Sequence, residues 1–92
     1  MQKFIAAPDV CATLLAEELV LLDLKTNHYF KLNEVGALVW SMIVSAKTKS
    51  ELVDRVCEQY DIVRTSCLED VDALLKTLLS RGLVVSVPDE PL

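Results

Sequence analysis

The chain has few of the residues that interrupt regular structure. Only two glycines and three prolines occur among its 92 residues, and two of the prolines, Pro88 and Pro91, lie at the C-terminal end. The body of the chain is therefore expected to consist of regular elements with short connections. At this length it should form one domain, because single cores typically span about 100–150 residues.

The residue combinations that build catalytic and metal sites are also scarce. The chain has one histidine, His28, and three cysteines, Cys11, Cys57 and Cys67, without a CxxC pair. A closed zinc site needs four ligands, and the two glycines do not form a phosphate-binding loop. His28 is expected on the apolar-facing side of a short strand, which disfavours a catalytic pair with a cysteine. The sequence predicts no enzyme activity, no metal, no cofactor, and free, buried thiols in a reducing compartment.

Basic charge is too sparse for a nucleic-acid partner. Lysine and arginine total 9 against 14 aspartates and glutamates, which gives a net charge of −5. Affinity for nucleic acid depends on phosphates neutralised by a concentrated basic face. No apolar run approaches the roughly 20 residues of a membrane span, and the N-terminus lacks a signal-peptide layout. We therefore expect a cytoplasmic protein with neither a nucleic-acid nor a membrane partner.

What the chain does have is apolar material, 52% of its residues, in short extended runs. Strands are expected at residues 3–6, in a second extended piece before residue 15, and in the run ELVLLDL at 18–24. The turn 25–27 leads to HYFKL at 28–32, whose alternation places His28, Phe30 and Leu32 on one face and Tyr29 and Lys31 on the other. Residues 18–32 are therefore predicted to form a β-hairpin.

Three helices are expected after this hairpin. Asn33 suits the N-cap of the first, and Thr48 with Glu51 forms a capping box at the start of the second. The third is predicted from about Ser66, capped by Ser66 with Glu69, to Arg81, with Gly82 as its stop. Its core face would hold Leu68, Val71, Leu75, Leu78 and Leu79, and one flank would hold Cys67, Asp70, Leu74 and Arg81. Residues 83–87 could add a short final strand.

These elements predict an α+β, winged-helix-like domain in which a small three-stranded antiparallel sheet packs on three α-helices. Winged helices often bind DNA through a helix beside the phosphates. The third helix carries Glu69, Asp70 and Asp72, whereas such a helix should be basic. A DNA-binding regulator is therefore kept only as an alternative.

The short strand at 28–32 is the candidate binding feature. An edge strand presents unpaired main-chain groups that must be protected or used. An extended peptide can add to it as a further strand, with the flank of the third helix as the wall of a groove beside it. Two other readings stay open: the chain's own residues cover this strand, or a second copy of the chain pairs with an edge strand.

Several short pieces follow one another in a specific order: LLD at 21–23, the tyrosine-containing strand ending in Leu32-Asn33, Gly36 with Trp40, Tyr60-Asp61, Asp70-Val71 and Gly82-Leu83. Over about residues 15–85 the chain resembles the family of the pyrroloquinoline-quinone biosynthesis D protein (PqqD). That family includes stand-alone leader-recognition proteins of lasso-peptide and other ribosomally made, modified peptide pathways. Asn27 stands where the turn usually carries a glycine, a departure that leaves the subfamily open.

The resemblance implies a non-catalytic protein that binds the leader segment of a precursor peptide as an added strand. It would present the peptide to a separate enzyme, in lasso-peptide pathways a cysteine protease that removes the leader. The alternative is a peptide chaperone of quinone-cofactor biosynthesis that works with a radical SAM enzyme. One domain, 1–92, is implied, with its core at about 15–85 and a flexible tail at 86–92. The peptide-binding residues implied by position are His28, Tyr29, Phe30, Lys31, Leu32, Cys67, Asp70, Val71, Leu74, Leu75 and Leu78.

Overall fold

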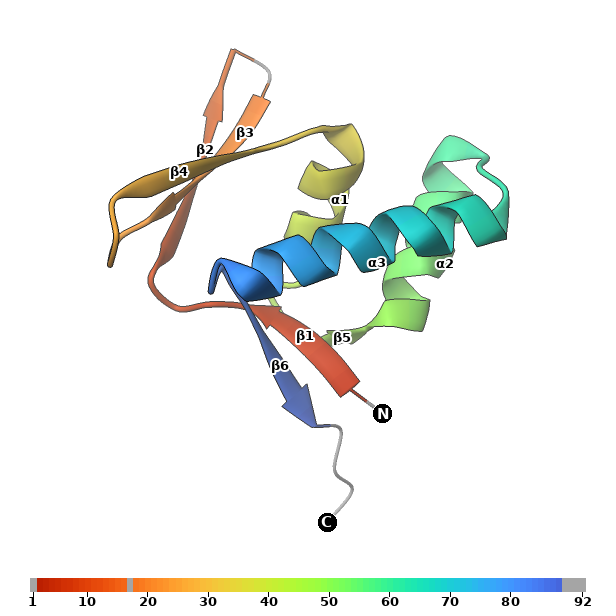
Figure 1. Ribbon diagram of the computed structural model, residues 1–92. Coiled ribbons are helices and arrows are strands. Elements are labelled where there is room, and N and C mark those ends of the chain that lie inside the picture. The colour runs from red at the N-terminus through yellow and green to blue at the C-terminus, as the bar shows by residue number, and fades with distance from the viewer. Residues whose placement is uncertain (1, 17, 89–92) are drawn as a thin grey trace.

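The computed structural model describes residues 2–16 and 18–88 and has an α+β architecture (Figure 1). Two three-stranded antiparallel sheets, with strand orders β2-β3-β4 and β5-β1-β6, combine with three helices. The predicted fold class is confirmed, although a second small sheet accompanies the one expected. In chain order the elements are β1 (Gln2–Ala6), β2 (Val10–Leu15), β3 (Glu18–Asp23), β4 (His28–Leu32), α1 (Glu34–Met42), β5 (Lys47–Thr48), α2 (Lys49–Tyr60), α3 (Arg64–Ser80) and β6 (Val84–Pro88).

The predicted hairpin is formed by β3 and β4. Its register runs from Asp23 opposite His28 to Leu19 opposite Leu32. Asn27 adopts a left-handed backbone with φ of 60°, and its N–H donates to the carbonyl of Asp23 at 2.7 Å. Asparagine tolerates this conformation, so it replaces a glycine at little cost.

The second sheet joins the two ends of the chain. β1 lies between β5 and β6, and its ladder with β6 runs from Ala6 opposite Val84 to Gln2 opposite Pro88. Residues 86–88 therefore belong to a strand, which corrects the prediction that a flexible tail begins at 86. They are ordered because β1 supplies their hydrogen-bond partners. The rest of the predicted tail, 89–92, lies outside the described residues.

The first two helices begin where the sequence predicts. The side-chain oxygen of Asn33 accepts the N–H of Gly36 at 2.8 Å. At the start of α2 the capping box is complete: the N–H of Thr48 donates to the Glu51 carboxylate at 2.9 Å, and the N–H of Glu51 donates to the Thr48 hydroxyl at 3.2 Å. Both caps satisfy amides that have no partner within their helix.

The start of α3 differs from the prediction. The helix begins at Arg64, its N-cap Val63 makes no side-chain cap bond, and Ser66 lies inside the first turn. The predicted cap of Ser66 with Glu69 is therefore wrong. The left-handed residue Asp61, with φ of 51°, ends α2 abruptly, so the connection needs few residues. Arg64 in the added turn forms an ion pair with Asp54 of α2.

The buried stripe of α3 is also shifted from the predicted one. Leu68, expected in the core, is 45% exposed, whereas Cys67, expected on the flank, is 1% exposed. Val71, Leu75 and Leu78 are buried as predicted, and Leu79 packs partly against the core. Burial raises the pKa of the Cys67 thiol to about 11. All three cysteines are free, but Cys11 is exposed and Cys57 half-buried, so the buried-thiol prediction is confirmed for Cys67 alone.

The C-terminal end of α3 turns the chain into β6. Gly82 has φ of +73°, its N–H donates to the carbonyl of Leu79 at 3.1 Å, and the N–H of Leu83 donates to Leu78 at 3.0 Å. This bond pair is a Schellman motif, which requires a left-handed residue at this position. Leu78 and Leu83 are both buried, so the motif also closes the core at this end. No helix of the described residues is long and apolar enough to cross a membrane.

Candidate functional site

β4 forms one edge of the sheet β2-β3-β4. All five of its residues are in register with β3, and no other strand of the described residues pairs with it. In an antiparallel strand every second residue directs its N–H and C=O away from the paired neighbour. β4 therefore leaves a row of main-chain groups without a strand partner among the described residues.

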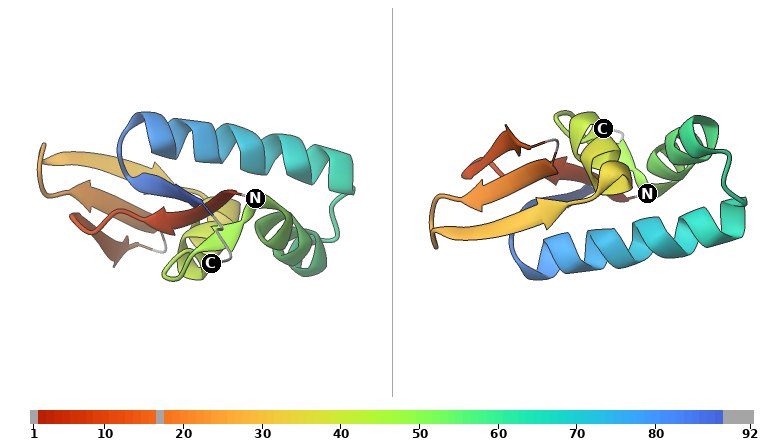
Figure 2. Two further views of the ribbon diagram at one scale, coloured as in Figure 1. Left: turned by 90° about the horizontal axis from the view of Figure 1, so that it is seen from below. Right: turned by 90° about the horizontal axis from the view of Figure 1, so that it is seen from above.

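α3 runs beside this edge. The two views of Figure 2 both show α3 alongside β4. The guanidinium carbon of Arg81 lies 5.0 Å from the centre of the Phe30 ring, which fixes the end of α3 against the middle of β4. Leu74 lies seven residues before Arg81, and Asp70 lies four residues before Leu74, so all three fall on one stripe of the helix. We call Asp70, Leu74 and Arg81 the Arg81 flank of α3.

The predicted strand residues divide between exposed and covered ones. Tyr29, 67% exposed, and Lys31 point outward, Phe30 is half-buried and Leu32 is buried, as the alternation predicts. His28 lies on the same face as Phe30 and Leu32 but is exposed, so its predicted apolar surroundings are wrong. The reason is its place at the first position of β4, beside the turn.

The predicted helix residues divide in the same way. Asp70 is exposed and Leu74 is half-buried, so both offer surface to a partner. The other four, Cys67, Val71, Leu75 and Leu78, are at most 1% exposed. They pack in the core and hold α3 in place, and their contact with a peptide stays a prediction. Arg81 was recognised on the flank by its helical spacing but was not among the predicted site residues.

Two pockets lie at opposite ends of β4. The smaller, of about 110 Å³, is at the turn before β4 and is lined by Asp23, Thr26, His28, Tyr29, Phe30, Arg81 and Leu83. It combines residues of the predicted edge with the end of α3. Its polar groups include a carboxylate, an imidazole and a guanidinium, so it suits a polar side chain of a docked segment.

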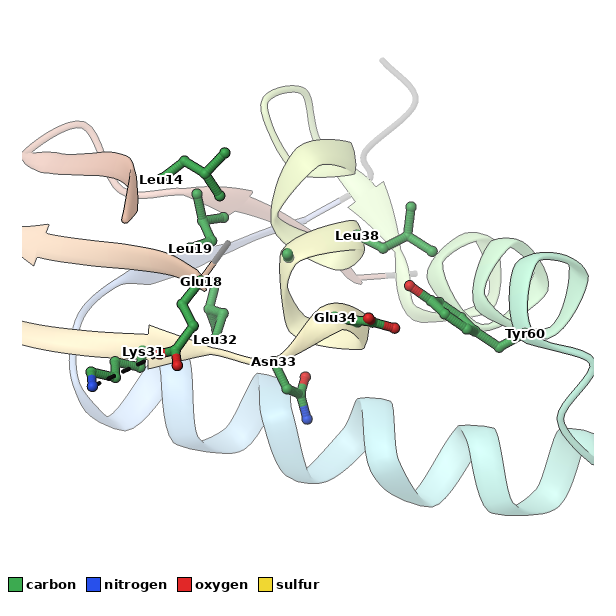
Figure 3. A pocket seen from close by; sticks show the side chains of 10 residues that line it. Leu14, Glu18, Leu19, Lys31, Leu32, Asn33, Glu34, Leu38 and Tyr60 are labelled. Carbon is green, nitrogen blue, oxygen red and sulfur yellow. Dashed lines mark ion pairs between the residues drawn. The ribbon is translucent and has the colours of Figure 1, made fainter. Parts of the chain in front are cut away.

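The larger pocket, of about 890 Å³, lies where β4 meets α1 (Figure 3). Leu14, Leu19 and Leu38 give it apolar walls, and Tyr60 of α2 closes its far end. At its rim Lys31 and Glu18 form an ion pair of 3.8 Å. This pocket could not be predicted from the sequence, because its walls come from five elements, β2, β3, β4, α1 and α2, that only the tertiary fold brings together.

No group of three or more His, Cys, Asp or Glu side chains among the described residues could hold a metal ion. The exposed carboxylate of Asp70 beside the edge is unsuited to a phosphate backbone.

Comparison with known proteins decides the family. The family of coenzyme PQQ synthesis protein D (PqqD) matches residues 18–84, well over half of the chain. The chain belongs to the PqqD family. The match begins at β3 and includes β4, all three helices and the start of β6, so it contains both the open edge and the Arg81 flank.

Solved structures similar to this PqqD-family chain agree with the assignment. One is TbiB1 in complex with the TbiA(beta) leader peptide, with 31% identity and a TM-score of 0.78 over 87% of this chain and 93% of that one. Another is a lasso peptide synthetase B1 complexed with the leader peptide. It shares the fold at a TM-score of 0.78, with 23% identity over 89% of this chain and 96% of that one. No curated protein gave a significant match.

Proposed function

We propose that this PqqD-family protein captures the leader segment of a lasso-type precursor peptide as an added strand on β4. It catalyses no step itself and delivers the peptide to a separate cysteine-protease-type leader peptidase. The observation that carries the proposal is the open edge of β4 beside the Arg81 flank of α3. The leader peptide in complex with TbiB1, the 31%-identical relative, supports it.

Affinity on this site would come from two sources. Main-chain bonds to β4 would each contribute about 0.5–1.5 kcal/mol net, independent of the peptide's sequence. Selection would come from the side chains beside the edge: Leu74 offers apolar surface, and Asp70 offers a charge to a basic residue of the peptide. Holding the peptide next to the peptidase would raise its local concentration there.

The family name, coenzyme PQQ synthesis protein D, supports a second candidate in quinone-cofactor biosynthesis. In that role the protein would act as a peptide chaperone for a radical SAM enzyme. Both candidates use the same strand-addition site and differ in the peptide and in the enzyme. The two similar B1 structures favour the lasso type.

Titration calorimetry tests the site with two synthetic leaders: the TbiA(beta) leader and the leader of the precursor encoded beside this gene. Leu74→Asp should weaken binding at least roughly tenfold, because a carboxylate would face the apolar part of the peptide. Leu68→Asp is the matched control, since Leu68 is an exposed leucine of the same helix outside the Arg81 flank. Equal affinities of both variants and the unmodified protein would disprove the site.

The role of the main chain is tested with proline at the edge. Lys31→Pro removes one N–H of β4 and should weaken leader binding, whereas Lys31→Ala removes only the side chain and should bind nearly normally. Circular dichroism checks that helicity is unchanged. Delivery is tested separately by leader cleavage with the peptidase, which should slow when this protein is omitted or carries Leu74→Asp.

A further inference from the structure

The opposite edge of the same sheet is also open. β2 pairs with β3 from Val10 opposite Asp23 to Leu15 opposite Glu18, and no other strand of the described residues pairs with it. From Cys11 onward every residue of β2 is exposed, with Leu14 at 70% and Leu15 at 54%. Open strand edges attract further strands.

β2 carries none of the devices that usually protect an edge. It has no lysine, no proline and no interruption in its register, and residues 10–16 contain no charged side chain. Of the neighbouring charges, Asp9 is paired with Lys25 at 3.3 Å. Leucines stand on both faces of the strand, because Leu14 and Leu15 are consecutive.

We propose that β2 pairs antiparallel with β2 of a second copy of this chain. A twofold axis through such a pair must be perpendicular to the sheet, so that one residue of β2 faces its own copy. With Ala12 at the axis, Leu14 stands opposite Val10 of the second copy; with Thr13 at the axis, Leu15 stands opposite Cys11. In either register an exposed leucine is covered by an apolar residue of the second copy. No like charges face each other within residues 10–16, because this segment has no charged side chain.

The dimer would extend the sheet across both copies in the order β4-β3-β2-β2-β3-β4. Both β4 edges would then lie at the outer ends and stay open. The self-pairing is therefore independent of leader binding and compatible with it. Since each copy carries a net charge of −5, the two copies repel each other, and salt should strengthen their association by screening this repulsion.

Sedimentation equilibrium from micromolar to sub-millimolar protein tests the proposal. The mass should rise with concentration from 10.2 kDa toward twice this value, and the rise should begin at lower concentration in higher salt. Thr13→Lys should raise the dissociation constant at least roughly tenfold, because two lysines would be brought close together in the pair. The matched control Thr13→Val keeps β-propensity and should still dimerise.

Cysteine cross-linking then identifies the register in a Cys11→Ser background. Ala12→Cys or Thr13→Cys should give a disulfide-linked dimer under mild oxidation, since only a residue at the axis meets its own copy at bonding distance. Cys11→Ser alone should give none. A mass of 10.2 kDa at every concentration, or a dimer that Thr13→Lys leaves intact, would overturn the proposal. So would association of β2 with the peptidase but not with itself. Leader titration of Thr13→Lys should give unchanged affinity, which separates this result from the peptide site.

Discussion

The guanidinium carbon of Arg81 lies 5.0 Å from the centre of the Phe30 ring, so a cation at the end of α3 covers an aromatic residue in the middle of β4. The two residues are far apart in sequence and belong to the two elements that flank the proposed peptide site. Arg81 is also the C-cap of its helix, where the helix dipole favours a positive charge. The contact therefore places the C-terminal end of α3 against the open edge.

A double-mutant cycle should show this coupling. Arg81→Ala, Phe30→Leu and the double variant are compared by urea denaturation, and the coupling energy should be about 0.5–1 kcal/mol, as for cation–π pairs with an exposed cation. Additive effects of the two substitutions would show that the pair does not hold α3. Arg81→Lys serves as a control that keeps the charge but loses the planar stacking.

Most helix boundaries of the fold could be predicted from local sequence signals. Asn33, Thr48 with Glu51, and Gly82 act within one turn of a helix, so their chemistry determines the boundary almost alone. Ser66 and Glu69 also match the capping-box pattern, but they do not cap a helix. Asp61 ends α2, and α3 begins before Ser66, at Arg64. The pairing of β1 with β6 was not readable, because it joins the two ends of the chain.

Gly36 should be intolerant of a side chain, although it lies inside a helix. A Cβ there would lie 3.0 Å from Cδ2 and 3.2 Å from Cβ of Leu32, and 3.3 Å from the capping oxygen of Asn33. Alanine would gain about 1 kcal/mol in helix propensity but lose about 1–3 kcal/mol by overpacking and by disturbing the cap. We expect Gly36→Ala to lower the free energy of unfolding in urea. A gain in stability would show that Leu32 can move away.

Which side chains of the candidate site are exposed could be predicted from the sequence for β4 but only partly for α3. Alternation in 28–32 correctly separated Tyr29 and Lys31 from Leu32, since a strand has a strict period of two. In α3 the expected stripe was broad, and apolar character alone did not show that Cys67 is buried while Leu68 is exposed. The phase of a helix depends on what packs against it, here α2 and β6, and that information is not local.

Acid should destabilise the protein partly through the start of α2. The backbone hydrogen bond from Thr48 lowers the pKa of Glu51, so the stability it contributes is present above the unfolded-state pKa near 4.5 and is lost as the pH falls through the folded-state value. Glu51→Gln can still accept the N–H of Thr48 but does not titrate. Thermal melts from about pH 6 to about pH 3 should therefore show a smaller loss of Tm for Glu51→Gln than for the unmodified protein. An equal loss of Tm in the two proteins would show that the acid sensitivity comes from groups other than Glu51.

The three cysteines should differ in reactivity in an order set by burial. Alkylation requires the thiolate and access to it. Cys67 has neither: it is 1% exposed, and its pKa is raised to about 11, so at pH 8 almost all of its thiol is protonated. Iodoacetamide labelling followed by mass spectrometry should modify exposed Cys11 first, half-buried Cys57 more slowly and Cys67 last. Cys11→Ser should remove the fast phase, and in denaturant all three should react at similar rates. If Cys67 were labelled as fast as Cys11 in the native protein, α3 would be separating from α2 on the timescale of labelling, and the Arg81 flank could not be a fixed wall beside β4.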